Sequence, residues 1–176
     1  LASALAAENS VAGVAATAIH LAQHLLSFDI GAVLLVDDAR GDLLPQPESV
    51  IGLPAHAHAL LQLTPRTETA CGRGESLHFE RALLRAGATG PYSTLIIDQQ
   101  LESLAAVPLL AGDRALGEIL LAAHSERAFA HDELQLLTII AAQIASALER
   151  ARLVAATDQD LQRRVEQLTA LTHVSR

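Results

Sequence analysis

The stretch that decides the fold is SLAAVPLLAGDRALGEILLAA, residues 103–123. It contains two apolar runs, Ser103 to Leu110 and Ala115 to Ala122, separated by Ala-Gly-Asp-Arg. A short Gly- and Asp-containing turn between two apolar runs is typical of a β-hairpin. We therefore expect these residues to form a hairpin of central strands.

Upstream of this hairpin, the sequence predicts a helix followed by a buried strand. Apolar residues recur at steps of three and four from Val11 to Leu25, which predicts a helix that begins near Asn9 or Ser10 and ends by Asp29. The run from Gly31 to Val36 predicts the strand, which ends at a turn containing Asp37, Asp38 and Gly41.

The segments between this strand and the hairpin are harder to interpret. Leu43 to Ile51 can return as a second hairpin arm, although Pro45 and Pro47 restrict it to a sheet edge or shorten it. From Gly52 to Thr94 we expect a short helix around Ala55 to Leu63 and then polar connections. Such regions often form variable loops.

Downstream of the hairpin, residues 132–176 contain neither proline nor glycine and predict one long helix. Apolar residues recur along it in alternating steps of three and four, which is typical of a coiled coil. The alternative is a long helix with a solvated tail. The repeat consists of Leu137, Ile140, Ile144, Ala147, Ala151, Val154, Asp158, Leu161, Val165, Leu168, Thr172 and Ser175.

Residues 103–123, and the Val107-Pro108-Leu109 step within them, closely resemble the C-terminal half of GAF domains. The resemblance continues through Phe129, Asp132 and Glu133, an element that GAF domains commonly place before their last helix. Phe129 can anchor that turn, while the two carboxylates favour the positive end of the helix dipole. The N-terminal helix and first strand also match, whereas residues 52–100 match poorly.

The resemblance implies an α+β fold: a GAF-like antiparallel sheet flanked by helices, with the N- and C-terminal helices packed together and a long C-terminal coiled-coil helix. We expect a sensory domain over residues 1–155. Residues 156–176 resemble a helical signalling linker toward a further module. The protein is then a fragment of a larger bacterial signalling protein, such as a sensor histidine kinase of a two-component system or a cyclic-dinucleotide enzyme.

The composition restricts the partners and the compartment. The chain of 176 residues has a net charge of −8 and no lysine. This balance does not favour the binding of nucleic acid or of an anionic membrane, both of which attract basic surfaces. Cys71 is the only cysteine, so no internal disulfide forms, and no signal peptide or membrane span is visible. We expect a soluble, cytoplasmic domain, although the full-length protein can itself be membrane-attached.

Candidate ligand-binding residues cluster between the first strand and the hairpin. Guanidinium forks suit the carboxylate or phosphate groups of a ligand. If residues 79–86 are helical, two of these arginines share one helix face, although Glu75 and Glu80 can equally pair with them and the cluster can equally be solvated. The candidates are Arg73, His78, Arg81, Arg85 and Tyr92.

Other site chemistries find little support in the sequence. The cyclic-nucleotide signature of phosphodiesterase-like GAF domains includes a lysine, which is absent, and bilin-binding relatives follow their cysteine with histidine, whereas Cys71 precedes Gly72. His56, His58, Cys71 and His78 match no strong zinc pattern. We expect no metal, no cofactor and no catalytic residue, because no known catalytic motif occurs.

We therefore expect a non-enzymatic sensory GAF domain that forms a parallel homodimer through its terminal helices and relays a small-molecule signal to a downstream output. A second hypothesis is a structural dimerisation or spacer module without a ligand. A third is a redox-active GAF-like enzyme that uses Cys71, although one cysteine makes such a cycle difficult to complete.

Overall fold

The computed structural model describes residues 10–64, 66–83, 87, 89–126 and 129–174. Their core element is a five-stranded antiparallel sheet with the order β2-β1-β5-β4-β3. The hairpin expected from residues 103–123 is confirmed, and its strands occupy the second and third positions from one edge. The strands are β1 (Ile30–Val36), β2 (Leu43–Pro45), β3 (Leu77–Glu80), β4 (Ser103–Ala111) and β5 (Arg114–Ala123).

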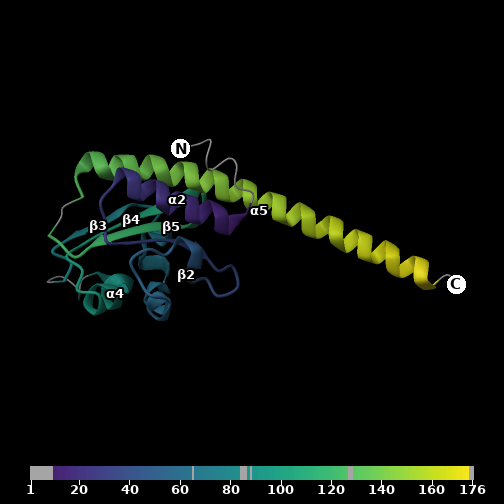
Figure 1. Ribbon diagram of the computed structural model, residues 1–176, viewed down its shortest axis with the longest axis horizontal. Coiled ribbons are helices and arrows are strands. Elements are labelled where there is room, and N and C mark those ends of the chain that lie inside the picture. Colours follow the sequence, from purple (N-terminus) through teal and green to yellow (C-terminus); the bar gives the residue numbers. More distant parts are fainter. Residues whose placement is uncertain (1–9, 65, 84–86, 88, 127–128, 175–176) are drawn as a thin grey trace.

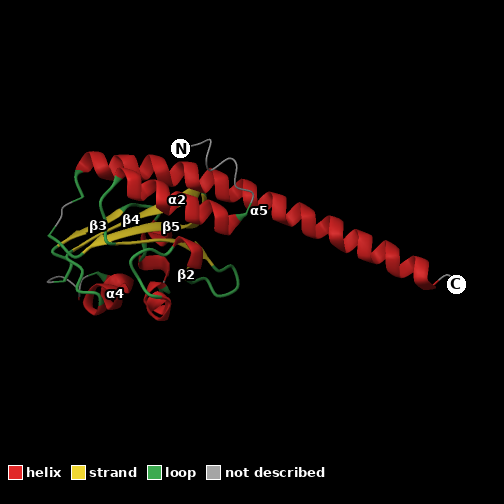
Figure 2. Cartoon of the chain, viewed as in Figure 1, coloured by secondary structure: helices red, strands yellow, loops and turns green. Residues whose placement is uncertain are grey.

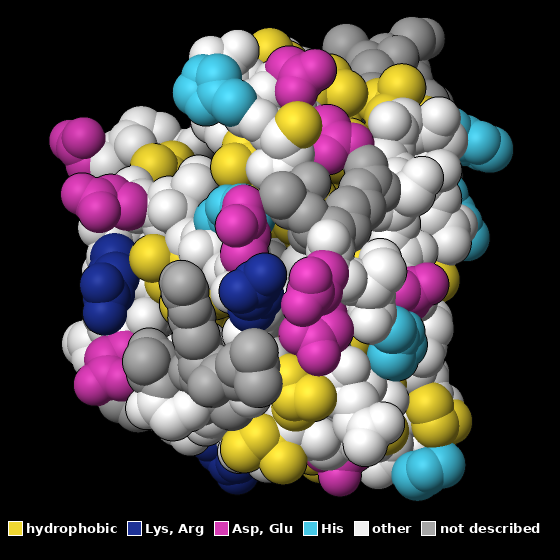
Figure 3. Space-filling view, turned by 90° about the vertical axis from the view of Figure 1, so that its left-hand side faces the viewer, with side chains coloured by type: hydrophobic (Ala, Val, Ile, Leu, Met, Phe, Trp, Pro, Cys, Tyr) yellow, Lys and Arg dark blue, Asp and Glu magenta, His cyan; other side chains and the backbone are white. Residues whose placement is uncertain are grey.

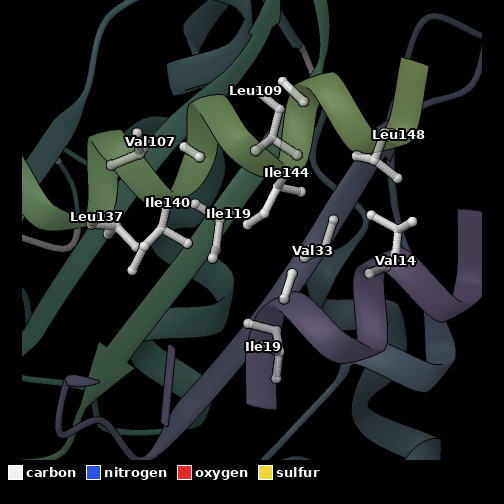
Figure 4. Close-up of a cluster of buried hydrophobic side chains, with 14 of the residues drawn as sticks. Val14, Ile19, Val33, Val107, Leu109, Ile119, Leu137, Ile140, Ile144 and Leu148 are labelled. Atoms are coloured by element: carbon white, nitrogen blue, oxygen red, sulfur yellow. The ribbon is translucent and has the colours of Figure 1, made fainter. Parts of the chain in front are cut away.

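One face of the sheet is covered by two long helices, α2 (Val11–Leu25) and α5 (His131–Val174), which lie side by side (Figure 1). Leu137, Ile140, Ile144 and Leu148 of α5 point toward the sheet and toward α2 (Figure 4). All four side chains are at most 1% exposed. The expected packing of the N- and C-terminal helices against each other is confirmed.

The other face of the sheet is covered by short helices and loops (Figure 2). Their apolar side chains form a second buried cluster with the sheet. The helices of this layer are η2 (Ala55–Leu61), η3 (Arg66–Glu68), α3 (Ala70–Arg73), η5 (Gly90–Tyr92) and α4 (Ser93–Asp98), whereas η1 (Pro47–Ser49) lies against α2. The described residues of the segment that was hardest to interpret from sequence therefore contribute most of this second layer.

Local side-chain contacts fix the beginnings of both long helices. The Ser10 hydroxyl accepts the amide of Gly13 at 3.0 Å, which is an ordinary N-cap for α2. Before α5, the Glu133 carboxylate accepts the amide of Ala130 at 3.0 Å, and Phe129 is 3% exposed within the core. The role expected for Phe129 and Glu133 at this turn is confirmed.

The character of α5 changes where it leaves the domain. The repeat positions from Leu137 to Ala151 are buried, whereas Val154, Leu161 and Val165 are 47%, 57% and 61% exposed. Beyond Ala151 the helix extends away from the sheet, and no other element of the described part of the chain lies beside it (Figure 1). The first half of the predicted repeat thus belongs to the core of the domain itself. The side chains of Leu168, Thr172 and Ser175 lie outside the described ones.

Two expectations need correction. Residues 79–86 do not begin as a helix, because Phe79 and Glu80 belong to β3, whose pairing with β4 overrides local helix propensity. The second hairpin arm is limited to Leu43–Pro45 at the sheet edge, and the chain turns at Pro47 into η1. The helix expected near Ala55 is present as a 3₁₀ helix.

Candidate functional site

The centre of β5 contributes a buried carboxylate to the layer of short helices. Glu118 lies opposite Leu34 of β1 and Pro108 of β4. Its side chain is 0% exposed, and among the described residues it is the only carboxylate that is fully buried. Burying a carboxylate is costly unless hydrogen bonds compensate it, so its partners define what it does.

Glu118 connects the sheet to two of the covering segments. The amide of Cys71 in α3 donates to Oε2 at 2.9 Å. The hydroxyl of Tyr92 in η5 donates to Oε1 at 3.0 Å and to Oε2 at 3.2 Å, and it accepts the amide of Ala70 at 2.9 Å. One carboxylate and one phenol therefore hold the start of α3 and the end of η5 against β5.

Burial changes the proton affinities in this cluster. Desolvation raises the pKa of Glu118 to about 7, and the hydrogen bonds from Cys71 and Tyr92 oppose that shift. Desolvation, followed by the charge of Glu118, raises the pKa of Cys71 to about 11 and raises that of Tyr92 as well. The thiol and the phenol remain protonated at neutral pH, whereas Glu118 is poised to titrate.

A small pocket lies at the surface beside this cluster. Its volume is about 170 Å³, and four elements on the side of the sheet opposite α5 contribute to it. The Phe79 ring in its wall lies 5.9 Å from the Tyr92 ring, so the pocket adjoins the buried cluster through an aromatic contact. The lining residues are Glu68, Arg73, Leu77, Phe79, Thr89 and Gly90.

The structure brings two of the five sequence-predicted ligand residues to this region. Arg73 lines the pocket. Tyr92 is fully buried behind it, with its hydroxyl bound to Glu118 and to the amide of Ala70. Tyr92 therefore supports the pocket wall and does not line the pocket.

The other three predicted residues lie elsewhere. His78 is on β3 but contacts Phe129 edge-on at 6.0 Å, on the face of the sheet that α5 covers. Arg81 adopts a positive φ of 50° and pairs with Glu126 at 3.7 Å in an exposed position. Arg85 lies outside the described residues. The structure thus does not bring the predicted cluster together as one site.

Sequence reasoning missed two residues, Glu118 and Glu68. Glu118 had a detectable signal, because it is a single carboxylate within an apolar strand. Glu68 had none, because it belongs to a polar stretch and reaches the pocket only through the packing of η3.

In the part of the chain that the structure describes, the candidate metal ligands His56, His58, Cys71 and His78 do not come together. Among the described residues, no group of three His, Cys, Asp or Glu side chains is close enough to hold a metal ion. His56 and His58 lie on η2, whereas Cys71 is buried in α3 and His78 faces the opposite side of the sheet.

A larger hollow, of about 250 Å³, lies between the end of α2 and the end of β5. Its charged residue, Asp29, is already satisfied, because it accepts the amide of His124 at 2.8 Å and lies 3.2 Å from Nδ1 of the same residue. This hollow therefore offers a ligand fewer unsatisfied groups than the pocket that Arg73 and Glu68 line.

The exterior at the end where α5 begins is of mixed charge. Figure 3 shows arginines interspersed with acidic side chains over this face. None of the helices in the described part of the chain combines the length and the apolarity that a membrane crossing requires.

Comparison with protein families gives one match over most of the chain. Residues 10–150 match the model of the GAF domain family. None of the curated proteins that were searched matches the sequence.

Solved structures show the same architecture. A domain of a two-component sensor histidine kinase from Sinorhizobium meliloti is 22% identical, with a TM-score of 0.67, over 81% of this chain and 93% of that one. The GAF domain of a phosphoenolpyruvate-protein phosphotransferase from Coxiella burnetii is 18% identical, with a TM-score of 0.70, over 86% and 90%. Free methionine-R-sulfoxide reductase from Neisseria meningitidis, solved with its substrate, is 20% identical, with a TM-score of 0.68, over 87% and 86%.

Proposed function

Since this chain belongs to the GAF domain family, we propose that it is a non-enzymatic sensory domain that forms a parallel homodimer and relays a small-molecule signal to an output module. The observation that carries this proposal is the exposed apolar stripe on the part of α5 that leaves the domain. In this proposal the sensory region is residues 1–155, and residues 156–176 are the linker toward the output module.

The distal part of α5 needs a partner. Leu153 is 64% exposed, and Val154, Leu161 and Val165 are each about half exposed or more. Isolated helices are marginally stable in water, and most helical stability in proteins comes from packing an apolar face. A second copy offers the same stripe at the same height, and a two-fold axis parallel to the helices pairs the stripes as a coiled coil.

Relay requires that the ligand-binding side of the sheet communicates with α5. The same sheet separates the two layers, and α5 packs directly on β4 and β5. A ligand can shift a conformational equilibrium only if it binds the two arrangements with different affinity. We therefore propose two arrangements of α5 relative to the sheet, one of which the ligand favours.

The relatives support a sensory role by analogy, since fold alone does not define function. They include a domain of a sensor histidine kinase and a segment of a methyl-accepting chemotaxis protein. We propose that this domain likewise acts in the cytoplasm as one part of a larger signalling protein.

Disulfide cross-linking tests the dimer. In a Cys71→Ala background, we expect Leu161→Cys to form a symmetric disulfide rapidly, because a parallel pair places the two residues opposite each other. Gln159→Cys, on the far side of the same helix, is the matched control and should cross-link slowly. Equal rates for both variants, or no symmetric disulfide at Leu161, would overturn the parallel dimer.

A ligand-free spacer is the second candidate. In its favour, apolar side chains fill most of the space between the sheet and residues 52–100, and the remaining pocket is small. The two candidates differ in one measurement: a sensor changes its α5 cross-linking rate when its ligand is added, whereas a spacer does not.

A redox enzyme that uses Cys71 is a weaker candidate, suggested by the similarity to a methionine sulfoxide reductase. The Cys71 thiol is only 2% exposed, and its pKa is raised to about 11, so little of the reactive thiolate is present at neutral pH. We expect Cys71 to react slowly with Ellman's reagent in the folded chain and rapidly in urea. Fast reaction in the folded chain would show that the Cys71 thiol is accessible and reactive, and would support the redox enzyme.

A further inference from the structure

We propose that the pocket lined by Glu68 and Arg73 binds the zwitterionic head of a small apolar α-amino acid. This inference rests on the sensory function proposed above and specifies its ligand class.

The first argument is the charge pattern. Glu68 and Arg73 carry opposite charges and line the same pocket. Among the described residues, neither of them takes part in an ion pair, with each other or with a third residue. An α-amino acid carries its carboxylate and its ammonium on the same carbon atom, Cα. The carboxylate suits the planar fork of Arg73, and the ammonium suits the carboxylate of Glu68.

The second argument is the apolar part of the lining. Leu77 and Phe79 point to the same face of β3, since they are two residues apart, and both are half-buried against the second apolar cluster. They give an aliphatic side chain of the ligand a surface to cover. Phe79 in turn rests against the Tyr92 ring, which is held by Glu118.

The third argument is size. The pocket volume of about 170 Å³ is below the range of about 300 to 1,000 Å³ that is usual for sites of drug-sized ligands. It is too small for a nucleotide or a tetrapyrrole, whereas a single amino acid is of suitable size.

Gly90 keeps the acidic side of the pocket in place. Its φ is +58°, and a Cβ at this position would lie 3.0 Å from Oε2 of Glu68. A larger residue would strain the backbone and push the Glu68 carboxylate from its position. Glycine here allows the carboxylate to lie directly over the η5 backbone at the pocket wall.

The pocket also has a short physical connection to α5. Arg73 is followed by Gly74, which caps α3 in a left-handed conformation. Gly74 and Ser76 line a neighbouring hollow together with Thr138 and Ala142 of α5. A ligand that draws Arg73 inward therefore moves a segment that borders α5.

The test uses L-leucine and two analogues that each lack one charge. The analogue 4-methylpentanoate has no ammonium, and 3-methylbutylamine has no carboxylate. Isothermal titration of the full chain measures the affinity of each compound. We expect L-leucine to bind at least tenfold more tightly than either analogue, because each charge-assisted hydrogen bond contributes separately.

Two variants test which pocket residue binds the carboxylate of the ligand and which binds its ammonium. Arg73→Gln should weaken L-leucine binding at least tenfold. Glu68→Gln should bind L-leucine only as tightly as the unaltered chain binds 4-methylpentanoate. The same variant should bind 4-methylpentanoate at least as tightly as the unaltered chain does, because this analogue has no ammonium for Glu68 to bind. Arg40→Gln and Glu48→Gln, at exposed positions away from the pocket, are the matched controls and should bind like the unaltered chain. Circular dichroism verifies the fold of each variant.

The outcomes separate this inference from the proposed function. If L-leucine, L-valine and L-phenylalanine all fail to bind, or if the pocket variants bind like the controls, the amino-acid site is overturned, whatever the oligomeric state. If L-leucine binds as expected but leaves the Leu161→Cys cross-linking rate unchanged, the ligand site stands and the relay to α5 fails.

Discussion

At the scale of single residues, Glu118 combines a structural role with a titration near neutral pH. Its carboxylate holds Cys71 and Tyr92 against β5, yet desolvation raises its pKa to about 7 from an ordinary 4.5. A carboxyl whose pKa is higher in the folded state keeps its proton when the unfolded chain has already lost it. The contribution of Glu118 to folding stability therefore decreases as the pH rises from about 4.5 to about 7 and is constant above that range.

Glu118→Gln should remove this pH dependence. Because one pKa unit corresponds to about 1.4 kcal/mol, the unaltered chain should lose on the order of 3 kcal/mol relative to the variant between pH 4.5 and 7.5. Urea unfolding of both proteins at several pH values measures the difference, in which the contributions of the eight histidines cancel. Parallel stability curves would show that Glu118 is not titrating in this range.

The hydroxyl of Tyr92 can be tested separately. Tyr92→Phe leaves the buried amide of Ala70 without its acceptor and removes one donor from Glu118. We expect a loss of about 1 to 3 kcal/mol in the free energy of unfolding. The double variant with Glu118→Gln should lose less than the sum of the two single losses, because the residues share one network. Additive losses would contradict the network.

At the scale of elements, the sheet depends on the close approach of β1 and β5 at Gly117. A Cβ at Gly117 would lie 2.0 Å from the carbonyl oxygen of Leu34. We expect Gly117→Ala to cost about 3 kcal/mol or more, since the strands must separate to admit a methyl group. Gly87→Ala, where a Cβ meets nothing within 4 Å, is the matched control. Chemical denaturation should leave Gly87→Ala near the unaltered chain, and equal stability of both variants would refute the close approach.

The elements with a strong periodic signal were predictable from the sequence. The β4–β5 hairpin, α2 and α5 each have a long apolar pattern and a local start signal, such as Ser10 or Glu133. The edge strand β3 was missed, because Leu77–Glu80 is short and its identity comes from pairing with β4. Residues distant in sequence supply that information, and a local pattern does not contain it.

The site was less predictable than the fold, for the same reason. Arg73 was found by its chemistry, but its neighbour in the pocket is Glu68 and not His78 or Arg81. Strand alternation decides this, because His78 faces α5 while Leu77 and Phe79 face the pocket layer. A strand assignment for β3 would have separated His78 from the candidate cluster.

At the scale of the whole molecule, the apolar stripe of α5 is buried in the domain over its first half and exposed over its second half. Up to Ala151 the stripe is part of the domain core, and from Leu153 onward the same helix exposes its apolar residues. A rotation or shift of α5 on the sheet must therefore change the orientation of the distal stripe. In the proposed dimer, a single rigid helix is sufficient to convert a small movement at the sheet into a change in how the two copies meet.

This division of α5 predicts what happens when the chain is shortened to residues 1–155. All the α5 residues that the structure describes as buried remain in the shortened chain, so we expect it to fold with an unchanged circular dichroism spectrum per helical residue. It loses Leu161 and Val165, so its dimerisation should weaken at least tenfold by analytical ultracentrifugation. The melting temperature of the full chain should rise with protein concentration, whereas that of the shortened chain should not.

Two full-length variants distinguish the loss of the stripe from the loss of length. Leu161→Glu places a charge in the stripe and should behave like the shortened chain. Gln159→Glu adds the same charge on the opposite side of α5 and should dimerise like the unaltered protein. If the shortened chain dimerises as strongly as the full one, the interface lies on the domain itself, and the distal helix serves only as a linker. The apolar residues of the stripe are buried up to Ala151 and exposed beyond it. We therefore expect the shortened chain and Leu161→Glu to dimerise weakly, because exposing four large apolar side chains on a lone helix is unfavourable in water.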